Sequence, residues 1–173
     1  SHKAAGNADP IEVTLPNSWN PSFIVRDHGV GLSVDEITDF YSKYGASSKR
    51  NTDDQVGLLG LGCKSGLTYT NQFSVTGIKH GVKTIALVTR DTDGAGLIQV
   101  LDTVSTDERD GVEVSIPVKD INSFNRRAAT FFSFWEAGSV LVDGAAPESI
   151  FDQGVKLDDD IVVLTDNDVD NDY

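Results

Sequence analysis

Alternation of apolar and polar residues predicts strands along most of this chain. Two early segments, 11–15 (IEVTL) and 23–27 (FIVRD), alternate as half-buried strands do. Four later segments are separated by the turn signals HG, DTDG and DERDG, which predicts an antiparallel meander. These segments are QFSVTGIK (72–79), VKTIALVTR (82–90), GLIQVLDTVS (96–105) and VEVSIPV (112–118), the last with Val112, Val114, Ile116 and Val118 on one face. Shorter strands are predicted in SVLVDG (139–144) and DIVVL (160–164).

Helical periodicity follows the second strand. Ser33 begins a predicted helix, because Ser33 and Glu36 fit a capping box in which each side chain accepts from a free backbone N–H. The apolar residues of this helix share one face: Val34, Ile37, Phe40, Tyr41 and Tyr44. A second helix is predicted over 122–137.

The first residues, 1–7, read as the last turns of a helix that ends at Gly6. The chain contains no methionine. We therefore expect the sequence to begin inside a longer protein; a processed or engineered end is the alternative.

Composition narrows the function classes. A length of 173 residues suits one domain with at most a short extra piece. The net charge of −13 argues against a broad nucleic-acid surface, and a single cysteine excludes an internal disulfide. No apolar run has transmembrane length, and the sequence shows no signal-peptide pattern.

The acidic end of the chain is not read as a calcium site. Asp166, Asp168 and Asp170 alternate as in an EF-hand loop, but that loop needs a glycine at its sixth position and a glutamate at its twelfth. Asn171 takes the sixth position, so a solvated acidic tail is the better interpretation.

The stretch GLLGLGCKS (57–65) is close to a phosphate-binding P-loop but does not fit one. No buried strand precedes it, and the extra Cys63 would turn Lys64 by about 100° on a helix, away from the phosphate. A Rossmann fingerprint fails as well, because Val34 stands where the third glycine of the upstream cluster would be.

The two glycine clusters make chemical sense together. Asp27, at a strand end, is placed to accept a hydrogen bond from an adenine amino group, and glycines directly after it let the backbone approach the base. In the second cluster, Gly60 and Gly62 can point consecutive N–H groups at phosphates, with Lys64 adding positive charge. The small and charged residues between the clusters, 45–56, read as a lid.

This pairing resembles the GHKL superfamily of gyrase, heat-shock chaperone, histidine kinase and MutL ATPases. The shared pattern is D-x-G-x-G (27–31), a lid, and then G-x-x-G-x-G (57–62), with GVEV (111–114) where the family carries G-[ST]-x-V. The segment YGASSKR (44–50) is similar to the MutL-type lid, and the chain is most similar to phage rIIA-type proteins. The resemblance covers roughly Pro10 to Lys119.

The resemblance implies an α+β, two-layer α/β sandwich (the Bergerat ATP-binding fold), with a mixed, mostly antiparallel sheet and helices on one face. Residues 1–119 would form the ATP-binding domain without its N-terminal helix. Residues 120–173 would add a C-terminal helix and strands, as the end of that domain or the start of the next. The implied nucleotide-binding residues are Asp27, Gly29, Gly31, Leu32, Ser47, Ser48, Lys49, Gly57, Leu59, Gly60, Leu61, Gly62, Lys64, Ser65 and Val112.

Two departures from the family bear on chemistry. Val112 stands where many members have Thr or Ser, which removes a hydroxyl beside the base. The family's water-activating Glu and Mg²⁺-binding Asn lie on a helix expected before Ser1, so no catalytic residue and no metal ligand is assigned here. The implied cofactors are ATP and Mg²⁺. We expect the parent protein to hydrolyse ATP and this chain alone to bind it weakly or not at all.

Competing functions and simpler roles remain open. The chain is an ATPase that drives a conformational or dimerisation switch, a scaffold that keeps the fold without turnover, or, ranked last, a histidine kinase catalytic domain. The implied partners are ATP and either a second copy or a neighbouring domain. By analogy, the implied location is the cytoplasm of an infected host, with peripheral membrane association.

Single residues also have plain interpretations. Asp27 could simply cap a strand end, and Lys64 could be a solvated helix residue. Cys63 is read as a small buried residue, and His28 and His80 are read as turn residues because they lack metal-ligand spacing. A core or interface role is expected for the aromatic group Phe131, Phe132, Phe134 and Trp135.

Overall fold

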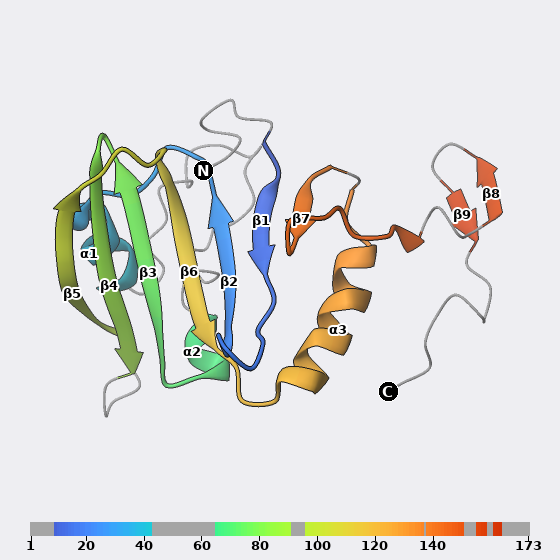
Figure 1. Ribbon diagram of the computed structural model, residues 1–173, viewed down its shortest axis with the longest axis horizontal. Helices are drawn as coiled ribbons and strands as arrows, with labels where there is room; N and C mark the ends of the chain where they lie inside the picture. Colours follow the sequence, from blue (N-terminus) through green and yellow to red (C-terminus); the bar gives the residue numbers. More distant parts are fainter. Residues whose placement is uncertain are drawn as a thin grey trace.

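Seven strands form one sheet in the order β5-β4-β3-β6-β2-β1-β7 (Figure 1). The computed structural model describes residues 9–42, 65–90, 96–136, 138–150, 155–158 and 161–163. The strands of this sheet are β1 (Ile11–Thr14), β2 (Ser22–Asp27), β3 (Gln72–Lys79), β4 (Val82–Arg90), β5 (Gly96–Ser105), β6 (Gly111–Pro117) and β7 (Val140–Val142). A separate two-stranded sheet contains β8 (Val155–Asp158) and β9 (Ile161–Val163), and the helices are α1 (Val34–Ser42), α2 (Gly66–Tyr69) and α3 (Ile121–Ser133).

The predicted meander is wrong at its last strand. β3, β4 and β5 are consecutive antiparallel neighbours, but β6 lies between β3 and β2 instead of beside β5. Its apolar residues Val112, Val114 and Ile116 pack against the main core cluster, a position that an edge strand would leave half exposed to water. The pairs are antiparallel except β1 with β7, so the sheet is mixed.

The turn between β3 and β4 was predicted correctly. Lys79 pairs with Val82, leaving His80 and Gly81 as a two-residue loop with φ values of 53° and 75°. Two positive φ values define the type I′ turn, whose twist matches that of the flanking strands. His80 is therefore a turn residue, as its sequence context indicated.

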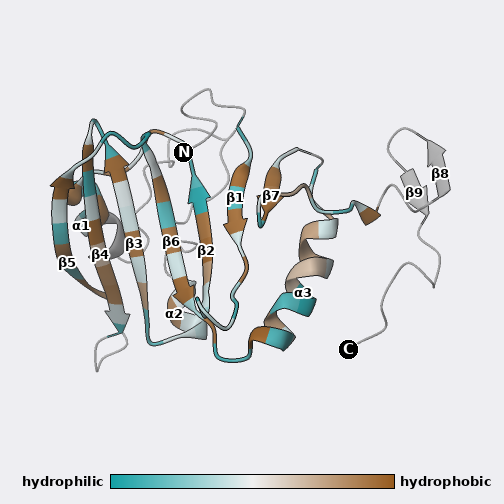
Figure 2. Cartoon of the chain, in the orientation of Figure 1, coloured by the Kyte–Doolittle hydropathy of each residue, from teal (hydrophilic) through white to brown (hydrophobic). Residues whose placement is uncertain are grey.

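Two apolar clusters lie on the same face of the sheet. The first contains Phe73, Val75 and Ile37 of α1, and the second contains Val13 and Phe132 of α3. Strand register places both clusters on one face of the sheet. Val25 of the second cluster pairs with Val114, which pairs in turn with Val75 of the first, and side chains in one row point to the same face. Figure 2 shows the alternating polar and apolar residues along the strands that produce this arrangement. The predicted α+β, two-layer architecture is confirmed.

The helix at the C-terminal side of β6 begins and ends differently from its prediction over 122–137. Asp120 caps α3 by accepting from the Ser123 N–H at 3.0 Å, and the helix ends at Ser133. The aromatic residues at the end of α3 differ in burial: Phe132 is 4% exposed, whereas Phe131 is 59% exposed. Both predicted late strands exist as β7 and β9, and β8 was not predicted.

Several predictions fall outside the described residues: the helical end at 1–7, the lid at 45–56 and the acidic tail at 165–173. Within the parts of the chain that the structure describes, no helix has the length and apolar character needed to cross a membrane.

Candidate functional site

Three neighbouring strands bring distant residues into one row at the end of β2. Asp27 pairs with Val112 of β6, and Val112 pairs in turn with Gly77 of β3. In one row of a sheet the side chains point to the same face, here the face covered by the helices. The Asp27 carboxylate therefore lies at the end of β2, beside the apolar side chain of Val112 and in line with Gly77, which has no side chain.

Asp27 also shapes the loop that follows it. Its Oδ1 accepts the Gly29 N–H at 2.8 Å, an Asx turn that folds the chain back over the strand end. An ionised carboxylate has about four acceptor positions on two oxygens. The Gly29 contact thus fixes the orientation of a group that can accept more than one hydrogen bond.

The loop lies in direct backbone contact with the neighbouring strands. Gly31 has φ of +67°, and a Cβ there would lie 1.8 Å from the carbonyl oxygen of Ile78. A Cβ at Gly111 would lie 2.1 Å from the Asp27 carbonyl oxygen. A Cβ at Gly77 would lie 2.3 Å from the carbonyl oxygen of Leu32. Glycine is required at these positions because any side chain would push the loop off the sheet.

The start of α1 anchors the other end of this loop. Glu36 accepts the Ser33 N–H at 2.7 Å, and the Ser33 hydroxyl accepts the Glu36 N–H at 3.3 Å, which confirms the capping box. The Lys79 ammonium at the end of β3 donates to both Glu36 oxygens, at 2.7 and 2.8 Å. The Lys79 hydrogen bond and then the Ser33 N–H lower the pKa of Glu36 from 4.5 to about 2. The loop is thus fixed by Asp27 at one end and by a charged pair at the other.

Two apolar residues flank the row. Leu32 and Val112 are partly buried and pack against the cluster that contains Ile37 of α1.

Next to Asp27, His28 Nε2 lies 3.1 Å from Glu12 Oε1 on β1. The described residues contain no group of three or more His, Cys, Asp and Glu side chains arranged as metal ligands would be.

Of the predicted site residues, the structure brings together Asp27, Gly29, Gly31, Leu32 and Val112. Ser65 is described separately, as the residue before α2, where its carbonyl accepts from the Thr68 N–H at 2.9 Å. The remaining predicted residues lie outside the described part of the chain: Ser47, Ser48, Lys49, Gly57, Leu59, Gly60, Leu61, Gly62 and Lys64, and with them Cys63.

Sequence reasoning missed two contributors to this region. Gly77 was read only as part of a strand, although glycine inside a strand often marks the close approach of another backbone. Lys79 carried no signal, because its partner Glu36 lies far away in the chain and is reached only through the β3 register.

No family model and no curated protein matches this sequence. Solved structures do match the fold. The ATPase region of Saccharomyces cerevisiae topoisomerase II aligns with TM-score 0.55 and 14% identity, over 80% of this chain and 42% of that one. The same region bound to ICRF-187 (dexrazoxane) aligns with TM-score 0.53 and 15% identity, over 78% and 41%. The ATPase and transducer domains of DNA topoisomerase II from Balamuthia mandrillaris align with TM-score 0.55 and 17% identity, over 82% and 43%.

At these identities the likeness concerns the fold. The chain spans less than half the length of each of these structures. The ATPase region of type II topoisomerases is a GHKL-fold domain, so the fold that the motifs implied is the fold observed.

Proposed function

We propose that this chain, which has the fold of GHKL ATPase domains, is the ATP-binding domain of an ATPase in which nucleotide binding and hydrolysis drive a conformational or dimerisation switch. The observation that carries the proposal is the row of Asp27, Val112 and Gly77, with the loop from Gly29 to Leu32 held against it by backbone contact. An adenine needs a hydrogen-bond acceptor for its amino group, apolar walls for its faces and room for close backbone approach. This strand end supplies all three kinds of group.

In the proposed complex, Asp27 accepts from the adenine amino group while its Oδ1 keeps the Gly29 N–H. Leu32 and Val112 contribute apolar surface beside it. The Glu36–Lys79 pair holds the loop in place and does not touch the base. Because the backbone contacts of Gly31 and Gly77 and the Glu36–Lys79 pair restrict this loop, binding the base would cost little further ordering of it.

The phosphate side of the proposal rests on the motif resemblance. Backbone N–H groups of Gly57, Gly60 and Gly62 would hold the phosphates, with Lys64 and Ser65 near them and the lid residues Ser47, Ser48 and Lys49 closing over them. Mg²⁺ would neutralise phosphate charge during transfer to water. None of the described residues is assigned as the Mg²⁺ ligand or as the base that activates water.

The same resemblance supports three finer assignments. The parent would be an rIIA-type phage protein that acts in the cytoplasm of the infected host, with peripheral membrane association. Its partner would be a second copy or a neighbouring domain. These assignments depend on the motifs at 44–50 and 57–65 and not on the fold.

A scaffold without nucleotide turnover is the second candidate. It is favoured by Val112, which stands directly opposite Asp27 and offers no hydroxyl where many family members have Thr or Ser. Under this alternative the loop contacts would serve only to complete the sheet.

The test compares Asp27→Asn with Asp107→Asn, a matched loss of one carboxylate charge from an exposed loop position. ATP binding is measured by calorimetry on the full-length parent, and turnover by phosphate release. We expect Asp27→Asn to weaken ATP binding at least tenfold, since a hydrogen bond to a charged group contributes about 1.5–3 kcal/mol. Asp107→Asn should leave both measurements unchanged.

Equal affinity in the two variants would contradict the assignment of Asp27. A parent that binds no ATP and releases no phosphate would favour the scaffold. Calorimetry on this chain alone adds a further check, because tight ATP binding there would contradict the expectation of weak binding.

A further inference from the structure

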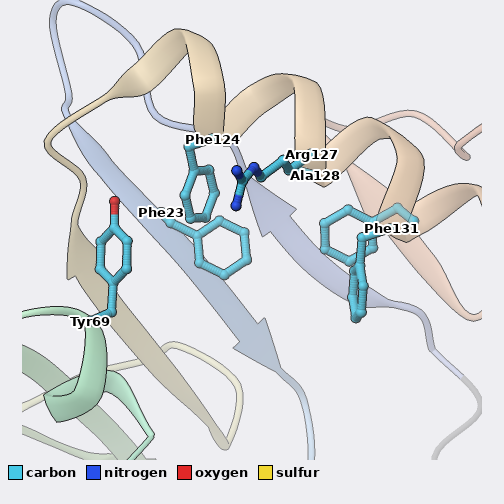
Figure 3. Close-up of a pocket in the computed structure, with 7 residues that line it drawn as sticks. Phe23, Tyr69, Phe124, Arg127, Ala128 and Phe131 are labelled. Carbon is cyan, nitrogen blue, oxygen red and sulfur yellow. The ribbon is translucent and has the colours of Figure 1, made fainter. Parts of the chain in front are cut away.

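An aromatic pocket of about 490 Å³ lies between β2, α2 and α3 (Figure 3). Phe23 and Phe124 form one wall, with ring centroids 5.0 Å apart, and Tyr69 meets Phe124 edge-on at 6.2 Å. The remaining lining residues belong to α3: Arg127, Ala128, Phe131 and Phe132. This volume lies within the range of sites that hold small molecules.

The pocket is distinct from the Asp27 row of the candidate nucleotide site. It uses Phe23 at the start of β2, whereas Asp27 ends the same strand. Four residues of strand separate the two positions by about 13 Å. A ligand in the pocket would therefore not contact the Asp27 row, and this inference does not depend on the proposed function.

Large apolar surface in the pocket is left open to solvent. Phe131 is 59% exposed and Tyr69 is 48% exposed, although both have aromatic neighbours that hold their rings in place. On α3, Phe124 and Phe131 are seven residues apart, about 10.5 Å along the helix axis. Ala128 lies between them and contributes only a methyl group, which leaves room for a planar group between the two rings.

The charge in the pocket indicates what kind of ligand fits. Among the described residues that line the pocket, Arg127 alone is charged, and in Figure 3 its side chain extends from α3 toward the rings of Phe23 and Phe124. No residue in the described part of the chain is paired with its guanidinium. A cation that has no partner among the described residues and lies beside an apolar surface favours an anion with an apolar body.

We propose that this pocket binds a small aromatic monoanion, a carboxylate or a sulfonate, whose rings pack between Phe124 and Phe131 and whose charged group pairs with Arg127. The same guanidinium geometry suits either oxyanion, because both present two oxygens to its parallel N–H donors.

Two fluorescent probes that differ only in charge test this proposal. The first is 8-anilinonaphthalene-1-sulfonate, and the second is N-phenyl-1-naphthylamine, which has the same rings without the sulfonate. We expect one equivalent of the sulfonate to bind at least tenfold more tightly than the neutral probe, and added salt to reduce only that advantage. ATP should leave the sulfonate signal unchanged.

Variants assign the signal to the pocket. Arg127→Gln should remove the preference for the sulfonate, whereas Arg126→Gln, its neighbour outside the lining, should keep it. Phe131→Ala should weaken both probes, and near-ultraviolet circular dichroism checks that each variant is folded.

Other outcomes would overturn the proposal. Equal binding of the two probes, or equal effects of Arg127→Gln and Arg126→Gln, would show that the pocket does not select an anion. No binding by the folded protein would mean that a chain segment or a second copy covers the pocket, and light scattering would distinguish these two occupants.

Discussion

Replacing Gly31 by alanine tests whether the loop after β2 lies on the sheet as described. Alanine adds two costs at this position. With φ of +67° an L-residue is strained by about 1–2 kcal/mol. The new Cβ would also lie 1.8 Å from the Ile78 carbonyl oxygen, and relieving such an overlap typically costs about 1–3 kcal/mol. We expect a total loss of about 3 kcal/mol in the free energy of unfolding.

Gly81→Ala provides the matched control. Its φ of +75° is nearly the same, but the nearest atom to its Cβ would be the Thr106 carbonyl oxygen at 3.6 Å, an ordinary contact. It should lose only the conformational part, about 1–2 kcal/mol. Gly111→Ala measures the cost of steric overlap alone, because the φ of Gly111 is not positive and its Cβ would lie 2.1 Å from the Asp27 carbonyl oxygen.

Urea and thermal unfolding measure these differences. For a chain of 173 residues, about 1 kcal/mol corresponds to roughly 2–4 °C in Tm. Gly31→Ala should therefore lower Tm by about 6–12 °C, and Gly81→Ala by about 2–8 °C. Equal losses in these two variants would refute the contact between the loop and Ile78, because only strain at positive φ would then be measured.

Two further predictions concern acid stability and the core. The pKa of Glu36 is lowered to about 2 in the folded protein, so its contribution to the free energy of unfolding is complete above pH 4.5 and is lost as pH falls toward 2. Because the Glu36 side chain is 42% exposed, we expect this contribution to be only about 1 kcal/mol and to be absent in Lys79→Met. An acid-unfolding profile that is unchanged in Lys79→Met would contradict the pairing. Phe132→Ala should lower the free energy of unfolding by about 3–5 kcal/mol because this ring is buried. Phe131→Ala, on the exposed side of the same helix, should lower it by about 1 kcal/mol. Similar losses for the two variants in urea unfolding would contradict the burial assignment.

The parts of the fold that depend on neighbouring residues were predictable. The capping box of Ser33 and Glu36 and the His80–Gly81 turn are each set by a few adjacent positions, and both are present. The two-layer fold followed from the ordered glycine motifs, whose resemblance carried information that periodicity alone does not contain.

The parts that depend on strand pairing were not predictable from pattern. An alternating segment such as β6 has the same periodicity at an edge or in the centre of a sheet, so its place between β3 and β2 could not be read from its residues. The opposition of Asp27 and Val112 depends on that place, and so does the contact of Gly77 with Leu32. Likewise, Phe131 and Phe132 are chemically identical, and only the orientation of α3 decides which one is buried.

The position of β6 also bears on the order of folding. β3, β4 and β5 are joined by short connections and can pair early, because closing a short loop costs little chain entropy. β2 pairs with β6 across the whole segment that contains β3, β4 and β5, and β1 pairs with β7 across a longer one, so we expect both pairings to follow the hairpins. The row that contains Asp27 therefore does not exist in a partly folded hairpin intermediate. We expect a ligand of this row to leave the early folding phase unchanged and to slow global unfolding.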